Sequence, residues 1–107
     1  MKTKVESKEF SEEEQQQVWE KGQVVQPNDP SVWRKDACGA WIKRSMYGDR
    51  SSQTNYGWEI DHIDPNGGDD ISNLRPLQWY NNVTKSDGKL TCPITAEGTK
   101  NVKKGSS

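Results

Sequence analysis

The sequence predicts an α+β fold built from short helices and short strands. Ser11 followed three positions later by Glu14 is a capping-box pattern, and a polar run suited to a helix comes after it. A second short helix is expected over residues 79–85, which contain neither proline nor glycine. Residues 40–47 and 58–63 mix aromatic, aliphatic and polar side chains, a composition that favours half-buried strands.

The length of 107 residues allows one domain, because independent cores usually need about 100 residues each. We expect residues 1–22 to form an N-terminal helical extension and residues 23–89 to form the folded domain. Residues 90–107 contain Pro93, Gly98 and several lysines, so we expect a flexible, disordered tail there. Only 29% of the residues are apolar, and the five tryptophans must therefore anchor a small core.

The cysteine content and the apolar runs indicate where the protein works. Cys38 and Cys92 are too few for a disulfide framework or a four-ligand zinc site, so we expect two free thiols. No run approaches the roughly 18 apolar residues of a membrane span. The charged N-terminal segment lacks the apolar core of a signal peptide. These observations predict a cytoplasmic protein with no membrane partner.

Basic side chains gather in the middle of the sequence, although the formal net charge is -1. Residues 9–20 contain acidic residues and neither lysine nor arginine, whereas residues 33–50 contain five basic residues and two acidic ones. We predict sequence-independent phosphate contacts with DNA from this central strip. Its members are Arg34, Lys35, Lys43, Arg44 and Arg50. The alternative interpretation of such a strip is a solvated charged face.

The residue types that carry chemistry lie between residues 58 and 85. An acid and an imidazole stand together at the end of a predicted strand, one amide follows a glycine-containing loop, and another lies on the predicted second helix. These groups are Asp61, His62, Asn73 and Asn82, with Lys85 one helical turn further on. Carboxylate and amide oxygens are ligands that suit Mg²⁺, and a neutral imidazole can take a proton from water at neutral pH. The set therefore indicates metal-assisted hydrolysis of a phosphodiester.

In these residues the sequence resembles the HNH endonuclease family. The ββα-metal (His-Me finger) fold of that family carries a strand ending in Asp-His, a loop, a strand opened by Asn-Leu, and a helix with Asn-x-x-Lys. The matching stretches here are Asp61-His62-Ile63, Gly67-Gly68, Asn73-Leu74 and Asn82-Val83-Thr84-Lys85. The resemblance covers residues 58 to about 88, and it implies a ββα-metal core in an enzyme that cuts DNA.

The resemblance also implies a role for each matching residue. His62 would be the general base, and Asp61 and Asn82 would hold one divalent metal ion. Asn73 would tie the loop and keep the base in place, while Lys85 would pair with a phosphate or a carboxylate. Mg²⁺ suits these oxygen ligands best, and Mn²⁺, Ni²⁺ and Zn²⁺ are the alternatives.

Several alternatives stay open at the level of sequence. Asn81 is the alternative to Asn82 as a metal ligand, because the doublet can be aligned with the motif in two ways. Many family members bind a structural zinc through Cys-x-x-Cys pairs, which this sequence lacks, so no structural zinc is expected. The alternatives to an enzyme are a non-catalytic DNA-binding module and a toxin-like nuclease effector with a protein partner.

Overall fold

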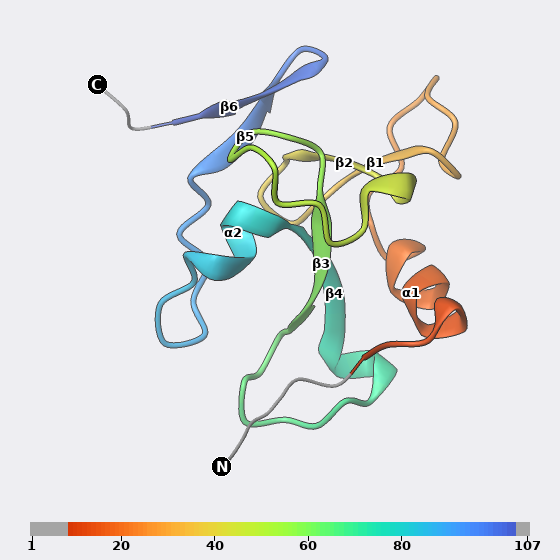
Figure 1. Cartoon of the computed structure of the whole chain (residues 1–107), viewed down its shortest axis with the longest axis vertical. Coiled ribbons are helices and arrows are strands. Elements are labelled where there is room, and N and C mark those ends of the chain that lie inside the picture. The colour runs from red at the N-terminus through yellow and green to blue at the C-terminus, as the bar shows by residue number, and fades with distance from the viewer. Residues whose placement is uncertain (1–8, 105–107) are drawn as a thin grey trace.

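The structure, a computed structural model, describes residues 9–104 and consists of short helices and three separate antiparallel hairpins (Figure 1). In chain order the elements are α1 (Glu12–Trp19), β1 (Trp33–Lys35), β2 (Trp41–Lys43), the 3-10 turn η1 (Arg44–Met46), β3 (Trp58–His62), the 3-10 turn η2 (Ile71–Asn73), β4 (Leu74–Gln78), α2 (Trp79–Val83), β5 (Ile94–Glu97) and β6 (Lys100–Lys103). The predicted α+β class is confirmed. Within residues 9–104, no helix is long and apolar enough to cross a membrane.

The first helix forms where the capping pattern predicts it. The Ser11 side chain accepts a hydrogen bond from the Glu14 backbone, and the Glu14 side chain accepts one from the Ser11 backbone. The helix ends at Trp19, and its last residues, Val18 and Trp19, are fully buried. The Trp19 ring packs against that of Trp58, with 5.3 Å between ring centroids. The burial of its apolar C-terminal end in the core therefore stabilises α1.

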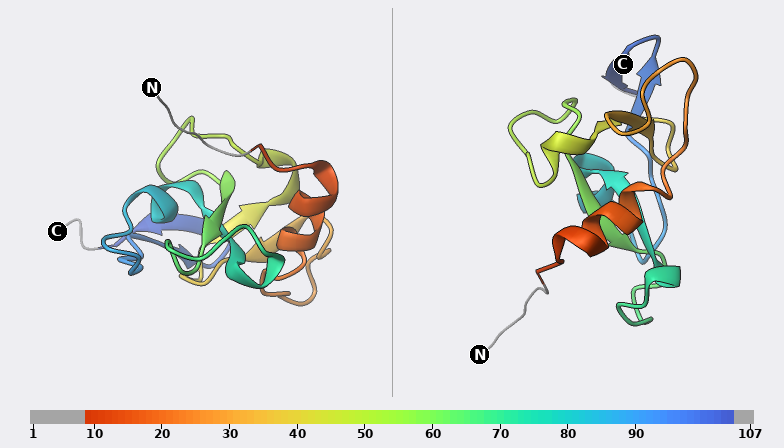
Figure 2. Two further views of the ribbon diagram at one scale, coloured as in Figure 1. Left: turned by 90° about the horizontal axis from the view of Figure 1, so that it is seen from below. Right: turned by 90° about the vertical axis from the view of Figure 1, so that its right-hand side faces the viewer.

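The central hairpin, β3–β4, divides the molecule between the two helices, with α1 on one side and α2 on the other (Figures 1 and 2). Successive side chains of a strand point to opposite faces. Trp58 and Ile60 accordingly lie in the core cluster with residues of α1, whereas Glu59 and Asp61 contact residues of α2 and the turn after it. The predicted strand at 58–63 and the predicted helix at 79–85 are both confirmed, each slightly shorter than expected.

The first hairpin is shorter than the sequence suggested. The strand expected over residues 40–47 ends at Lys43, because residues 44–46 turn into a 3-10 helix. Its partner β1, at residues 33–35, was not predicted. A three-residue strand is too short to show the alternation by which strands are recognised in a sequence.

The two cysteines form a disulfide, so the prediction of free thiols is wrong. Cys38 lies in the turn after β1 and Cys92 in the segment before β5, and their Cα atoms are 5.3 Å apart. They are separated by 54 positions in the sequence. The cysteine spacing can indicate a metal motif, but it carries no information about a single pair brought together by the fold.

The C-terminal segment is an ordered hairpin where the sequence led us to expect a flexible tail. Strands β5 and β6 pair around Gly98, which has a positive φ of 61°. Ile94 of β5 is fully buried, and the Asn101 side chain hydrogen bonds to both the backbone N–H and the carbonyl of Trp41. These contacts attach the hairpin to β2, so residues 94–103 belong to the folded body.

Candidate functional site at the end of the central hairpin

Helix α2 and the turn after it are joined to β3 by two polar contacts. Asn82 Nδ2 donates to Glu59 Oε1 at 3.0 Å, and Lys85 Nζ donates to Asp61 Oδ1 at 2.5 Å. The two donors are about one helical turn apart, and the two acceptors lie on the same face of the strand. The motif spacing Asn-x-x-Lys therefore matches the spacing of alternate residues on β3.

Asp61 is a buried carboxylate held between two cations. Its side chain is 4% exposed, and Arg75 Nε donates to Oδ2 at 2.8 Å while Lys85 occupies Oδ1. Arg75 lies directly opposite Asp61 in the hairpin register. Lys85 Nζ also donates to the His62 carbonyl oxygen at 2.9 Å. A buried charge needs such partners, and here they fix Asp61 to both β4 and the end of α2.

His62 presents its imidazole on the opposite side of β3. The side chain is about one-third exposed, and its ring centroid lies 6.4 Å from that of Phe10. His62 Nε2 lies 2.5 Å from Asp69 Oδ1, in the loop between β3 and β4. In the neutral tautomer in which Nε2 donates its proton to Asp69, Nδ1 carries the lone pair. The imidazole is accessible and oriented, as a general base needs to be.

Asn73 closes the loop that carries Asp69. Its amide oxygen accepts the Asp64 backbone N–H at 2.9 Å, and its amide nitrogen donates to the carbonyls of Asp64 at 3.0 Å and Gly68 at 2.9 Å. A Cβ atom at Gly67 would lie 2.6 Å from Asn73 Nδ2. Glycine at position 67 thus leaves room for the Asn73 side chain inside the loop.

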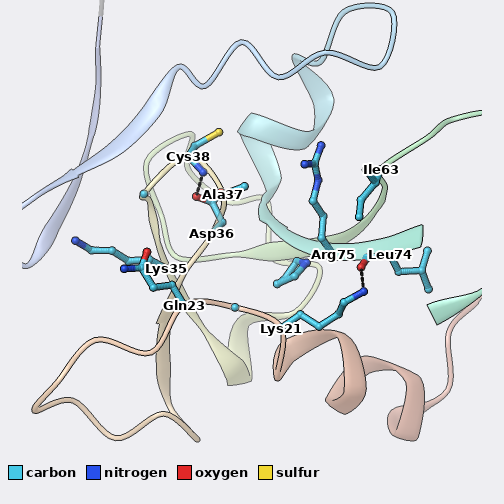
Figure 3. A pocket seen from close by; sticks show the side chains of 12 residues that line it. Lys21, Gln23, Lys35, Asp36, Ala37, Cys38, Ile63, Leu74 and Arg75 are labelled. Carbon is cyan, nitrogen blue, oxygen red and sulfur yellow. Dashed lines mark hydrogen bonds between the residues drawn. The ribbon is translucent and has the colours of Figure 1, made fainter. Parts of the chain in front are cut away.

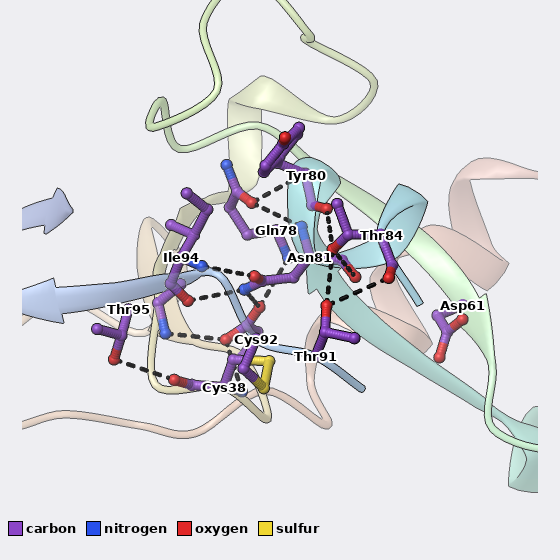
Figure 4. Close-up of a disulfide and its surroundings, with 12 residues drawn as sticks. Cys38, Asp61, Gln78, Tyr80, Asn81, Thr84, Thr91, Cys92, Ile94 and Thr95 are labelled. Atoms are coloured by element: carbon purple, nitrogen blue, oxygen red, sulfur yellow. Dashed lines mark hydrogen bonds between the residues drawn. A yellow bond between two sulfur atoms is a disulfide. The ribbon is translucent and has the colours of Figure 1, made fainter. Parts of the chain in front are cut away.

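The two adjacent asparagines of α2 have different surroundings. Asn81 is fully buried, and its amide exchanges hydrogen bonds with both the N–H and the carbonyl of Ile94 while also donating to Asp36 Oδ2 (Figure 4). Within the described part of the chain, the Asn82 amide oxygen accepts no hydrogen bond. This geometry favours Asn82 over Asn81 as a ligand, since Asn81 is committed to the scaffold.

A buried network lies beneath α2, next to the disulfide (Figure 4). Asp36, 4% exposed, accepts hydrogen bonds from four donors and has no cationic partner among residues 9–104. The donors are the backbone N–H groups of Cys38, Ala40 and Gln78 and the side chain of Asn81. Burial raises the pKa of the Asp36 carboxyl above its ordinary value, against the opposing effect of these hydrogen bonds.

The residues expected to hold a metal ion do not form a closed metal centre. Asp61, Asn82 and Glu59 carry oxygens of the kind that Mg²⁺ prefers, but Asn82 contacts Glu59, and both Asp61 oxygens are engaged by Arg75 and Lys85. In the part of the chain that the structure describes, no three His, Cys, Asp or Glu side chains form a metal-binding group. An ion at Asp61 would compete with Lys85 for Oδ1. Such an ion would take its other ligands from water and phosphate, as Mg²⁺ usually does.

The arginines that we expected to contact DNA are held by the protein itself. Arg34 donates to three backbone carbonyls around the end of α1 and the following loop. Arg44 donates to a glutamine side chain of α1, and Arg50 forms two hydrogen bonds with Glu59. Each of these side chains still carries its charge near the surface, but its geometry is set by an internal partner.

The two lysines of the expected strip lie on a different face. Lys35 is paired across the first hairpin with Trp41, and Lys43 with Trp33. Their ammonium groups lie 4.9 Å and 5.5 Å from the centroids of the Trp41 and Trp33 rings, within cation–π range. The structure therefore divides the predicted strip instead of bringing its side chains together.

Sequence reasoning missed four side chains that shape this region. Glu59 had a usable signal, since it alternates with Asp61 on the same strand. Asp69, Arg75 and Asp36 gave none, because their partners are reached only across the loop, the hairpin or the fold.

Comparison of the chain with protein-family models, with curated proteins and with solved structures found no match.

Proposed function

We propose that this protein is an endonuclease that hydrolyses DNA phosphodiester bonds with the help of one divalent metal ion. In this proposal β3, β4 and α2 form a core of the ββα-metal type. The observation that carries it is the arrangement at the end of the hairpin. An accessible imidazole is held by a loop carboxylate on one side of β3, and the preceding residue presents a carboxylate on the other side to the turn after α2. Lys85 joins the two, since it binds the Asp61 side chain and the His62 carbonyl.

The chemistry follows from the residues in place. His62 Nδ1 accepts a proton from the attacking water, while Asp69 keeps the ring oriented through Nε2. Asp61 and Asn82 would hold the ion, which when bound offsets the charge that develops on the phosphoryl and leaving oxygens. Asn73 fixes the loop that supplies Asp69. Mg²⁺ is the ion that this donor set suits best.

One observation favours a second candidate, a module that binds DNA without cutting it. Both oxygens of Asp61 are already engaged by Arg75 and Lys85. If these ion pairs persist on DNA, the site gains no metal and the basic side chains act only in binding. The two candidates differ in one outcome, the appearance of cut product.

The experiment is incubation of supercoiled plasmid with the pure protein and MgCl₂, with and without excess EDTA. The proposal predicts nicked circles in Mg²⁺ alone, because the developing charge is not stabilised when the ion is chelated. Nicking that is undiminished in EDTA would contradict the metal-dependent mechanism. Retardation of the plasmid without nicking, in the presence of Mg²⁺, Mn²⁺ or Ni²⁺, would select the binding module instead.

A further inference from the structure

One face of the first hairpin carries two tryptophans and two lysines at alternate corners. In the β1–β2 register Trp33 lies opposite Lys43, and Lys35 lies opposite Trp41. Cross-strand partners and alternate residues of a strand share a face, so these four side chains lie on the same side of the hairpin. We call this set the Trp–Lys face. Ile42, between the two β2 members, is fully buried in the core, so the Trp–Lys face is the side turned away from that core.

Both ammonium groups of the Trp–Lys face are available to an anion. The Lys35 ammonium lies 4.9 Å from the Trp41 ring centroid, and the Lys43 ammonium lies 5.5 Å from that of Trp33. The Lys35 side chain borders a hollow of about 650 Å³ beside β4 but extends away from it (Figure 3). Within residues 9–104, neither ammonium has a carboxylate partner. Each can therefore donate to a phosphate while it stays on its ring, because an ammonium has three N–H donors.

Both tryptophans of the Trp–Lys face also line a smaller hollow of about 180 Å³. Asn28, in the loop after α1, and Thr99, in the turn between β5 and β6, complete its lining. Clefts that take drug-sized ligands measure about 300–1,000 Å³, so this hollow suits a single small group. Trp41 is 6% exposed, whereas Trp33 is half-buried and presents the larger aromatic surface to such a group.

The rings are held in place by contacts that leave the polar groups of the hollow unengaged. Trp41 Nε1 donates to a backbone carbonyl of the β5–β6 turn at 2.7 Å, and the Tyr56 ring packs edge-on against Trp33 with 5.0 Å between centroids. Within residues 9–104, the side-chain amide of Asn28 and the hydroxyl of Thr99 make no hydrogen bond. The hollow thus offers a fixed aromatic wall and two hydrogen-bonding groups, which lowers the ordering cost of binding.

This arrangement matches a planar ring with hydrogen-bonding edges and a negative charge on either side. An unpaired nucleobase with its two flanking phosphates has that form, and proteins hold single strands by combining aromatic and basic side chains. A base in a duplex is paired and stacked, and it must be extruded before it can enter. We propose that the Trp–Lys face binds single-stranded DNA, with one unpaired base against Trp33 and the flanking phosphates on Lys35 and Lys43.

The proposed binding site is separate from the proposed catalytic residues. The first hairpin lies toward the opposite end of the molecule from the loop between β3 and β4, which carries Asp69 (Figures 1 and 2). The choice of DNA as the strand rests on the proposed function. The contacts that would hold the base and its phosphates do not depend on cutting, so binding and nicking can be tested independently.

The test is binding in EDTA, measured by fluorescence anisotropy with three labelled probes at several salt concentrations. The probes are a 20-base thymine strand, an abasic strand of the same length, and a 20-base-pair duplex that contains the thymine strand. Trp33→Leu removes the aromatic wall, and Trp33→Tyr is its conservative control. Lys35→Ala and Lys43→Ala each remove one cation, and Lys89→Ala makes the same change at an exposed position outside the Trp–Lys face. Circular dichroism establishes which variants fold.

The proposal predicts that the parent binds the thymine strand at least about five-fold more tightly than the abasic strand, because a stacked base strengthens binding by that order. Trp33→Leu should lose this preference, and Trp33→Tyr should keep most of it. Both should bind the duplex like the parent, because paired bases do not enter the hollow. Each change at Lys35 or Lys43 should weaken thymine-strand binding roughly two- to five-fold and flatten its salt dependence by about 0.7 unit of slope, whereas Lys89→Ala should bind like the parent.

Equal binding of the thymine and abasic strands by the parent overturns the proposal, and this comparison needs no variant. A folded Trp33→Leu protein that keeps the preference, or that loses as much affinity for the duplex, also overturns it. So do Lys35→Ala and Lys43→Ala proteins that bind like Lys89→Ala. The plasmid assay separates this proposal from the nuclease. Nicking without a base preference refutes the Trp–Lys face alone, whereas a preference that depends on Trp33, without nicking, supports the face and refutes the enzyme.

Discussion

Asp36 is the central acceptor of the buried network beneath α2. Its replacement by asparagine gives a quantitative test of that role. Asp36 Oδ1 accepts the N–H groups of Cys38 and Ala40, and Oδ2 accepts the N–H of Gln78 and the side chain of Asn81. In Asp36→Asn one of these oxygens becomes an NH₂ group. Either orientation of the new amide turns a donor toward two existing donors.

The size of the effect follows from the two donors that lose their acceptor. Asn81 cannot avoid the conflict by flipping its amide, because its oxygen and nitrogen already pair with the N–H and carbonyl of Ile94. A buried polar group left without a partner costs about 1–3 kcal/mol, so two cost about 2–6 kcal/mol. Removal of a buried charge offsets part of this cost. We expect the free energy of unfolding to fall by about 3 kcal/mol.

The loss should depend on pH in a direction that the raised pKa of Asp36 fixes. A carboxyl whose pKa is higher in the folded state contributes stability below its ordinary value near 4, and this contribution is lost as the pH rises through the folded-state pKa. Asparagine does not titrate. The difference in unfolding free energy between the parent and Asp36→Asn should therefore be largest at low pH. It should narrow as the pH rises through the folded-state pKa of Asp36.

The assay is urea unfolding, monitored by tryptophan fluorescence, at a series of pH values from below the ordinary pKa of an aspartate to above the folded-state pKa of Asp36. Asp87→Asn serves as the control, because Asp87 is exposed and its positive φ of 52° is tolerated by asparagine. A loss below 1 kcal/mol for Asp36→Asn, or a gap that widens as the pH rises, would refute the account of this network.

Two further predictions concern the disulfide and the loop. Reduction of Cys38–Cys92, which closes a loop of 54 positions, should lower the free energy of unfolding by about 4 kcal/mol, and an unchanged urea midpoint in reducing agent would count against this. Gly67→Ala should displace the Asn73 amide, speed hydrogen exchange in the loop and reduce plasmid nicking about ten-fold or more, since a misplaced base costs catalysis. Gly68→Ala is the control because no atom lies within 4 Å of its Cβ position, and equal activity in both variants would contradict the role of Asn73.

The sequence predicted the features that depend on neighbouring residues. The capping box placed the start of α1, and the run from residue 58 placed β3. The spacing of Asn82 and Lys85 was also informative, since both side chains reach β3. Each of these signals is local, because helix caps and strand alternation are set within a few positions of the chain.

The features that sequence reasoning missed depend on contacts between distant positions. The disulfide joins residues 54 positions apart, and Asn101 holds β2 across 60 positions. The lysine-rich C-terminal segment has the composition of a tail, yet the burial of Ile94 keeps it in place. The internal hydrogen-bond partners of the arginines were missed for the same reason. No local sequence pattern distinguishes an arginine that binds within the protein from one that binds a phosphate.

The role of His62 is the most direct test of the proposed nuclease. The measurement is plasmid nicking in MgCl₂ by His62→Ala, alongside anisotropy of the labelled duplex and circular dichroism of the same preparation. Asp61 and Asn82 do not depend on the imidazole for their contacts, so the account predicts parental DNA binding and an intact fold with nicking reduced by about 10²-fold or more. A folded His62→Ala protein that binds the duplex and nicks plasmid as fast as the parent would contradict the account.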